Sequence, residues 1–264
     1  MAKPHGTCDI SSNYVILNGC VSQKLPVALY IMKPHLVKHG EPLSISEVAV
    51  TGRFWKTFME KARTQVIPYQ WEALNDRIPD AEPSYAMRNF RVAAGKEKGE
   101  FGGRVFQDSD FAKWLEAVAY SLMWYPDPTL EQTADGAIRD VIAAQQPDGY
   151  LNTYYIINGL DKRFTNLRDD HELYCLGHML EGAIAYQQAT GKDELLKALV
   201  RYVDLVDSLI GPEAGKLRGY PGHQELELAL VKFYGITGNE KHLRLAKYFI
   251  DERGKEPLFF RDET

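Results

Sequence analysis

One stretch of the chain concentrates side chains that can do chemistry. Within Thr165–His178, His171, Cys175 and His178 follow one another at i, i+4 and i+7. This spacing places all three on one face of a helix, where two imidazoles and a thiolate could hold zinc together with a fourth ligand. No second pair of ligands at metal spacing accompanies them, and cysteine is among the most buried residue types. We therefore interpret Cys175 as a core residue and predict no metal site in this chain.

The helix that carries these residues is predicted to begin next to His171. Asp169 and Glu172 have the spacing of a capping box, which predicts that Glu172 satisfies the backbone at the helix start. His171 would lie in the first turn, where the helix dipole disfavours a protonated ring. A neutral imidazole at a pocket rim is a good hydrogen-bond partner for sugar hydroxyls. The alternative is a solvent-exposed or capping histidine.

A second histidine occupies the equivalent place before the next helix of this kind. His223 lies within Tyr220–Glu227, and we expect it at the same rim as His171. Asp108 and Asp110 start the preceding helix and would add carboxylates to the rim, with N-capping as their alternative role. The pattern predicts a polar pocket. It does not define a carboxylate pair at a known separation, which a glycosidase assignment would need.

Helical hairpins must position these residues. Shifting Thr190-Gly191 onto Thr237-Gly238 superposes the last two hairpins, so the unit repeats. A repeat of about 40–47 residues built from two helices indicates either an α-solenoid or a closed α/α toroid. The hairpins, each with helical periodicity on both sides of a tight turn, are Ser109–Trp124 with Thr129–Gln146, Asp170–Ala189 with Lys192–Ile210, and His223–Ile236 with Asn239–Glu252.

The connections before each hairpin favour the toroid. They are long, and each of them leads into the first helix of a hairpin. They must therefore gather at one end of the structure. We therefore predict an all-α fold made of helical hairpins of an (α/α)6 six-hairpin toroid. The sequence contains about seven predicted helices, whereas six hairpins need about twelve, so the toroid is expected to be incomplete.

The first part of the chain differs from the rest. Residues 1–44 contain four prolines and β-branched runs without a helical period, which predicts a loosely organised leader with a short strand or two. Residues 45–264 are assigned to the helical domain. The apolar residues Phe54, Phe58, Ala62 and Val66 predict a helix stripe that stops at Pro68 or continues kinked to Asn75. Residues 76–107 are expected to be irregular, and residues 148–154 to form an extended loop.

The composition excludes several functional classes. A formal net charge of -5 provides no basic surface for nucleic acid. The N-terminus lacks the order of a signal peptide, and no apolar stretch is long enough for a bilayer, so we predict a soluble, cytoplasmic protein without a membrane partner. The three cysteines form no disulfide framework. No Walker loop, dinucleotide fingerprint or nucleophile elbow is present.

Five separated motifs resemble glycoside hydrolase family 127, the β-L-arabinofuranosidases, once filed under a domain of unknown function. In chain order they are Pro68–Glu72, Gln107–Ala117, Asp148–Tyr154, His171–His178 and Pro221–Glu225. The resemblance covers roughly residues 45–255 and leaves the leader unmatched. Five motifs in the correct order make the resemblance specific.

The resemblance implies the N-terminal part of an (α/α)6 catalytic barrel that is followed by β-sandwich domains. It also implies retaining cleavage of terminal L-arabinofuranosides, with a zinc-bound cysteine thiolate as nucleophile and a glutamate as acid/base. Those residues and the zinc cluster belong to a region downstream of the match, so we expect them beyond Thr264 and assign no catalytic residue or zinc ligand here. The implied substrate-binding residues are His171, His223 and Gln70.

Two alternatives of a different kind stay open. One is a non-catalytic helical sugar-binding protein or scaffold, and the other is an α-solenoid interaction module. An incomplete barrel would also leave one side of its last hairpin uncovered, and self-association through that open edge is then expected. The apolar residues predicted on this exposed wall are Leu226, Leu230 and Phe233, or Leu245 and Phe249.

Overall fold

The computed structural model describes residues 14–17, 20–23, 43–256 and 258–259. The chain divides into two compact units, residues 1–58 and residues 59–264. In the first unit, strand β1 (Tyr14–Leu17) pairs with β2 (Cys20–Gln23) in an antiparallel hairpin. Both strands fall within the predicted leader, and the leader's boundary at residue 44 stays a prediction.

A nearly continuous helical segment runs through Pro68. It consists of α1 (Arg53–Lys61), a π-helical turn (Ala62–Val66) and α2 (Ile67–Leu74). Pro68 falls in the first turn of α2, a position where its missing N–H and fixed φ are tolerated. The predicted apolar stripe is not buried, because Phe54 is 63% and Phe58 52% exposed.

A short helix, α3 (Ala86–Ala93), interrupts the segment 76–107, so the prediction that this whole segment is irregular was wrong. Three apolar side chains of α3, those of Ala86, Met87 and Phe90, are fully buried. Asn89 is buried with them and its amide donates to the carbonyl of Gly102 at 2.9 Å. Packing against the rest of the fold stabilises a helix that is too short to form by itself.

A second short helix, α6 (Thr153–Asn158), begins inside the segment that was predicted to be an extended loop. The side chain of Asn152 caps it by accepting from the N–H of Tyr155 at 3.3 Å. Thr153 is tied to the start of another helix, because its N–H donates to Asp108 at 2.8 Å. The prediction of an extended loop was wrong for residues 153–154, because the local sequence pattern does not contain this long-range contact.

The three predicted hairpins are present, and the all-helical prediction is confirmed. Asp127 caps the second helix of the first pair by accepting from the N–H of Thr129 at 3.0 Å. Gly191 and Gly238 end helices with φ of 78° and 63°, a backbone region that glycine adopts readily. The pairs are α4 (Asp108–Trp124) with α5 (Pro128–Ala143), α7 (Glu172–Thr190) with α8 (Glu194–Leu209), and α9 (Leu226–Thr237) with α10 (Glu240–Glu252).

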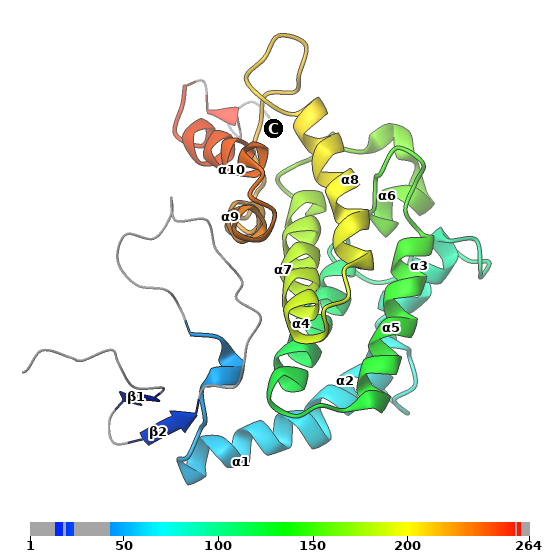
Figure 1. Ribbon diagram of the computed structural model, residues 1–264. Helices are drawn as coiled ribbons and strands as arrows, with labels where there is room; N and C mark the ends of the chain where they lie inside the picture. The colour runs from blue at the N-terminus through cyan, green and yellow to red at the C-terminus, as the bar shows by residue number, and fades with distance from the viewer. Residues whose placement is uncertain (1–13, 18–19, 24–42, 257, 260–264) are drawn as a thin grey trace, which may run out of the picture. The chain divides into compact units, whose positions relative to one another are not determined.

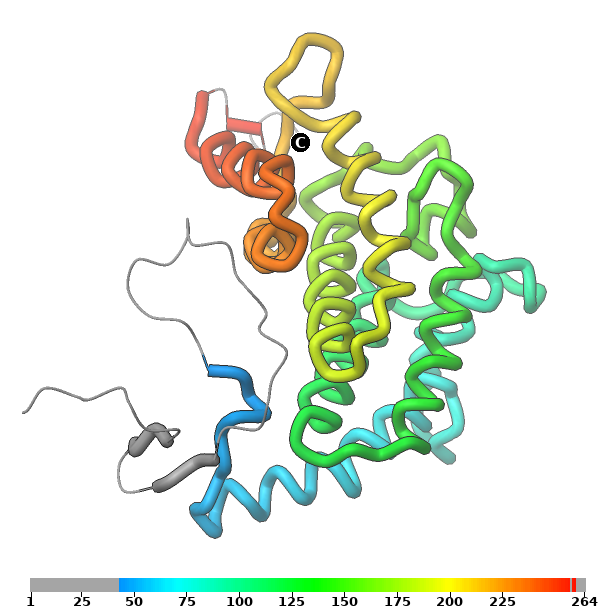
Figure 2. Tube along the Cα trace, in the orientation of Figure 1, coloured from blue at the N-terminus to red at the C-terminus, as the bar shows by residue number. Residues whose placement is uncertain are grey.

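The first helices of the three hairpins pack against one another. Helix α7 lies between α4 and α9, and its contact with α4 is the most extensive between any two described helices (Figures 1 and 2). Glycines allow the close approach. A Cβ on Gly182 would meet the carbonyl oxygen of Ala112 at 2.7 Å, and one on Gly177 would meet the N atom of Leu226 at 2.8 Å. The loops before these three helices therefore gather at one end.

The last hairpin turns a different face outward from the one that the sequence pattern predicted. The residues expected on an exposed wall are all 3% exposed or less: Leu226, Leu230, Phe233, Leu245 and Phe249. They face α7 and the partner helix of the hairpin, where Phe233 stacks on His242 at a centroid distance of 4.2 Å. The exposed apolar side chains of this hairpin are instead Leu228, Val231 and Ile250. In the described part of the chain, no helix is both long and apolar enough to cross a membrane.

Candidate functional site

Two histidines meet at the loop end of the inner helices. His171 directly precedes α7, and His223 lies in the loop that leads into α9. Their Nε2 atoms are 3.1 Å apart, and their ring centroids are 4.9 Å apart with an angle of 41° between the planes. The structure thus brings together the two residues that the sequence placed at one rim. Their contact with a sugar stays a prediction.

A close crossing of two loops holds this pair together. The N–H of Gly222 donates to the carbonyl of Leu167 at 3.1 Å. A Cβ at position 222 would come within 2.2 Å of the carbonyl oxygen of Arg168, so only glycine fits. His171 follows with a left-handed backbone (φ 57°), and its Nδ1 is hydrogen-bonded to the carbonyl oxygen of Asp169. We name His171 and His223 the histidine pair.

Tyr174 is the residue of this site that the sequence reasoning missed. Its ring contacts three imidazoles, with centroid distances of 5.5 Å to His171, 5.3 Å to His223 and 4.4 Å to His178. Its hydroxyl accepts from Nζ of Lys113 on α4 at 2.9 Å, and the same ammonium lies 5.0 Å from the ring centroid. The available signal was its position three residues after His171, which places both on one helix face.

One turn further along α7, His178 faces Glu225. Nδ1 of His178 is 3.2 Å from Oε1 of Glu225, and both side chains are mostly buried. Burial, with the nearby charge of Lys113, lowers the pKa of His178 to about 4. Burial, with the charge of Glu181 and other acidic neighbours, raises the pKa of Glu225. At neutral pH the imidazole of His178 is therefore uncharged, and the contact is not a full ion pair.

The predicted capping role of Glu172 is wrong. Its side chain is fully buried and turns away from the helix start, accepting from the N–H of Phe164 at 2.7 Å and from the hydroxyl of Tyr150. Burial raises the pKa of Glu172 to about 7, although both hydrogen bonds favour the charged form. Glu172 thus satisfies the hydroxyl of Tyr150 and the backbone N–H of Phe164, which lie in the segment between α5 and α7.

Asp108 and Asp110 have separate structural roles, and neither caps α4. Asp108 is buried and accepts from both the N–H and the hydroxyl of Thr153, so it ties α6 to α4. Burial raises its pKa to about 6. Asp110 accepts from the amide of Gln107 at 2.6 Å. N-capping was the wrong alternative because Asp108 binds the distant Thr153 and Asp110 binds the side chain of its neighbour Gln107.

Gln70 is not brought to the histidine pair. It lies on the exposed side of α2, and within the described residues it has no hydrogen bond to either histidine. Its neighbour Trp71 instead stacks on Trp114 of α4 with ring centroids 4.6 Å apart. This stacking anchors α2 on the hairpin layer, and the sugar contact of Gln70 stays a prediction.

The described residues do not fit a zinc site. Cys175 is 3% exposed, and burial raises the pKa of its thiol well above the usual value. Across the described ranges, no group of three or more histidine, cysteine, aspartate or glutamate side chains could hold a metal ion. Cys175 is therefore a core residue, as the sequence predicted.

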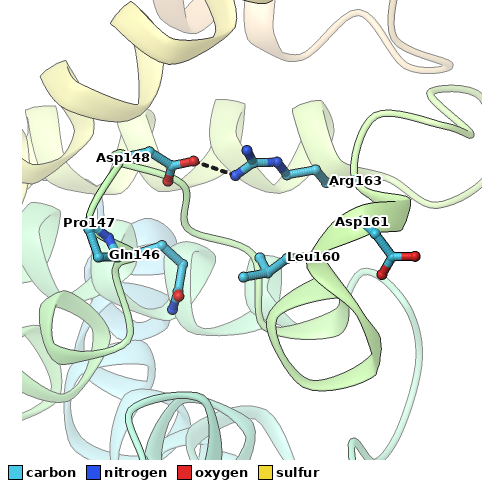
Figure 3. Close-up of a pocket in the computed structure, with 6 residues that line it drawn as sticks. All are labelled: Gln146, Pro147, Asp148, Leu160, Asp161 and Arg163. Carbon is cyan, nitrogen blue, oxygen red and sulfur yellow. Dashed lines mark hydrogen bonds and ion pairs between the residues drawn. The ribbon is translucent and has the colours of Figure 1, made fainter.

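A separate open pocket lies between the α5–α6 loop and the turn after α6. It has a volume of 390 Å³, and an ion pair of 2.5 Å joins Asp148 to Arg163 beside it (Figure 3). Gln146, Pro147, Leu160 and Asp161 complete its lining. None of the histidine-pair residues lines this pocket. The charges of Asp148 and Arg163 are paired with each other, and we take the histidine pair as the better candidate for a specific site.

Comparisons with known proteins identify the family of this chain. Residues 47–263 match the family described as "Beta-L-arabinofuranosidase, GH127 catalytic domain". A non-reducing end β-L-arabinofuranosidase of Bifidobacterium longum subsp. longum is 43% identical over 229 residues, which cover 81% of this chain and 35% of that protein. This chain thus spans about a third of the relative's length.

Two solved structures share the arrangement of helices. One is a GH127 β-L-arabinofuranosidase from Geobacillus stearothermophilus T6, with a TM-score of 0.80 and 57% identity over 82% of this chain and 34% of that one. The other is a GH127 β-arabinofuranosidase with a TM-score of 0.74 and 36% identity, covering 81% of this chain and 34% of that one. The hairpins of this chain therefore match part of an (α/α)6 barrel, and the chain belongs to the GH127 β-L-arabinofuranosidase catalytic-domain family.

Proposed function

We propose that this chain supplies a sugar-binding wall of a β-L-arabinofuranosidase and that the histidine pair contacts a terminal L-arabinofuranosyl residue. One observation carries the proposal: the Nε2 atoms of His171 and His223 face each other at 3.1 Å at the loop end of the inner helices. Imidazole nitrogens at this position can exchange hydrogen bonds with sugar hydroxyls. The relatives' names support the choice of sugar.

The surroundings of the pair suit a sugar better than a charged ligand. Tyr174 presents an aromatic ring beside both imidazoles, and apolar ring faces pack against the C–H faces of sugars. The positive charge of Lys113 is directed to the hydroxyl of Tyr174 and to Ser109 Oγ at 3.1 Å. Gln70 is proposed as a third contact on the strength of the resemblance alone.

We further propose that bond cleavage uses groups other than the described residues. A thiolate nucleophile needs a lowered pKa, whereas burial raises that of Cys175. The resemblance implies zinc and a glutamate acid/base, but the described residues do not form a metal site, so no step is assigned to them. The second candidate function is sugar binding without catalysis, for which the histidine pair alone would suffice.

Binding and cleavage can be tested separately. Titration of the chain with methyl β-L-arabinofuranoside should give saturable binding by calorimetry, and His171→Ala or His223→Ala should weaken it by about tenfold or more, as expected for a lost hydrogen bond that leaves a polar partner unpaired. Gln224→Ala, at the exposed neighbouring position, is the matched control. Equal affinity in all four proteins would overturn the proposal.

Hydrolysis of an aryl β-L-arabinofuranoside and the zinc content of the purified chain separate the two candidates. Turnover that depends on zinc would support the glycosidase. Binding without turnover would support the sugar-binding protein.

A further inference from the structure

The peptide group between Pro221 and Gly222, directly before His223, is held from both sides. Its N–H, which belongs to Gly222, donates to the carbonyl of Leu167 at 3.1 Å. Its carbonyl, which belongs to Pro221, accepts from Nη2 of Arg253 at 2.8 Å. Because a peptide group is planar, two hydrogen bonds on its opposite sides fix the orientation of the whole plane. The backbone that enters His223 therefore has one defined direction.

Arg253 reaches this loop from the end of α10, which it directly follows. Its guanidinium also lies 3.3 Å from Oε1 of Glu227 in the first turn of α9, and 4.7 Å from the ring centroid of Tyr220. The side chain of Glu227 is 5% and that of Arg253 23% exposed, so the two charges meet mostly out of water, where electrostatic contacts are stronger. One planar guanidinium thus joins a carbonyl, a carboxylate and an aromatic ring.

We infer that Arg253 is a positioning residue for His223, which acts through the carbonyl of Pro221 and determines where the imidazole of His223 lies relative to that of His171. The inference rests on the proposed function only for its effect on sugar affinity, because the position of the ring can be measured without a ligand. Within the described residues, Arg253 has no hydrogen bond with either histidine, so its influence passes through the backbone.

A second contact from α10 supports the same loop. The hydroxyl of Tyr248 accepts from the N–H of Gly219 at 3.1 Å. This bond reaches the loop further from His223 than the bond of Arg253 does. Because every residue in between adds two rotatable backbone bonds, the bond of Arg253 constrains His223 more closely. The end of α10 thus holds the loop at two points, and Arg253 holds the point next to the candidate site.

A lysine cannot take over all the contacts of Arg253. Its ammonium carries the same charge at a single point on a flexible chain, whereas the guanidinium spreads five donors over a rigid plane. We expect Arg253→Lys to keep an ion pair with Glu227 and to lose the bond to the carbonyl of Pro221. Glu227→Gln does the opposite, because it removes the charge of the ion pair and leaves the carbonyl bond in place. The two variants therefore separate positioning from stability.

The ring signals of the histidines report their position directly. In ¹H–¹³C correlation spectra of the free chain, assigned by single histidine substitutions, Arg253→Lys should shift the signals of His223 and His171. The signal of His242, which is buried in the same hairpin, should stay in place as long as the fold is intact. Arg244→Lys, the same exchange at an exposed position of α10, is the matched control and should shift none of the three.

Stability and sugar affinity complete the test. Glu227→Gln should lower the midpoint of urea denaturation and leave the signal of His223 in place. Arg253→Lys should weaken the binding of methyl β-L-arabinofuranoside by about threefold to tenfold, as expected for a misplaced hydrogen-bond partner. If Arg253→Lys lowers only the midpoint, or shifts the signal of His242 as much as that of His223, Arg253 is a structural residue and the inference is wrong. If the wild-type chain does not bind the sugar, the proposed function fails, and the histidine signals still decide the inference.

Discussion

Gly222 lies against the backbone of Arg168, and a Cβ at position 222 would come within 2.2 Å of the carbonyl oxygen of that residue. This contact joins the loop before α9 to the loop before α7. Because the oxygen belongs to the backbone, it cannot move aside as a flexible side chain would. The distance between His171 and His223 thus depends on a residue that has no side chain.

Gly222→Ala should therefore destabilise the fold and separate the histidine pair. We expect a loss of about 1–3 kcal/mol in the free energy of unfolding, as for other overpacked sites. Urea denaturation measures the loss. Gly254→Ala, at a glycine with no atom within 4 Å of its Cβ position, is the control and should change stability much less. Equal stability of the two variants would show that the loops have room to separate.

Stability should fall as the pH rises through the titration of Glu172. Burial raises its pKa from the usual value of a glutamate, near 4.5, to about 7, so between these values the folded state holds a proton that the unfolded state has released. The free energy of unfolding then decreases with rising pH, by up to about 3 kcal/mol in total. Glu172→Gln, which cannot titrate, should flatten this part of the pH profile, whereas Glu100→Gln at an exposed position should not. If the free energy of unfolding of Glu172→Gln depended on pH as that of the wild type does, Glu172 would not be the group that titrates.

Tyr174 is expected to position the histidine pair through its ring. Tyr174→Phe removes the hydrogen bond from Lys113 but keeps the ring contacts, so sugar affinity should change less than about threefold. Tyr174→Ala removes both and should weaken binding by about tenfold or more. Calorimetric titration with methyl β-L-arabinofuranoside compares the two. A larger loss in the phenylalanine variant than in the alanine variant would point to the hydroxyl instead.

Cys175 should be protected from thiol reagents. Its burial raises the thiol pKa and shields the sulfur atom. In a Cys8→Ser, Cys20→Ser background, only Cys175 can react. Its labelling rate in the folded protein should be about 100-fold or more below the rate in urea, as for a group that reacts only after local opening. Fast labelling in the folded state would show that the thiol is accessible.

We propose that the exposed apolar residues of α9 support self-association. Leu228 is 52% and Val231 40% exposed, and three-residue spacing places them on one helix face. Leu228→Ser with Val231→Ser should shift sedimentation toward the monomer. Leu217→Ser, at an exposed leucine outside the hairpin, should not. A wild-type chain that is monomeric at tens of micromolar would exclude the proposal.

Local sequence determined the helical hairpins and the place of the histidines. Helical periodicity and the turns at Thr190-Gly191 and Thr237-Gly238 depend on neighbouring residues only, so the pattern reveals them directly. His171 and His223 start equivalent helices, and packing of those helices side by side brings their starts together. The motif content also sufficed to indicate the family.

Only the tertiary structure decided which polar groups lose their water and which faces are covered. Glu172 and Asp108 have ordinary capping spacings, but loops distant in the chain enclose both of them. Leu226 and Leu228 are equally apolar, and only the position of α7 decides that the first is buried and the second exposed. Dehydration and coverage depend on long-range neighbours, which local periodicity does not contain. For the same reason the spacing predicted the two histidines but not Tyr174, whose contacts reach α4 and the loop before α9.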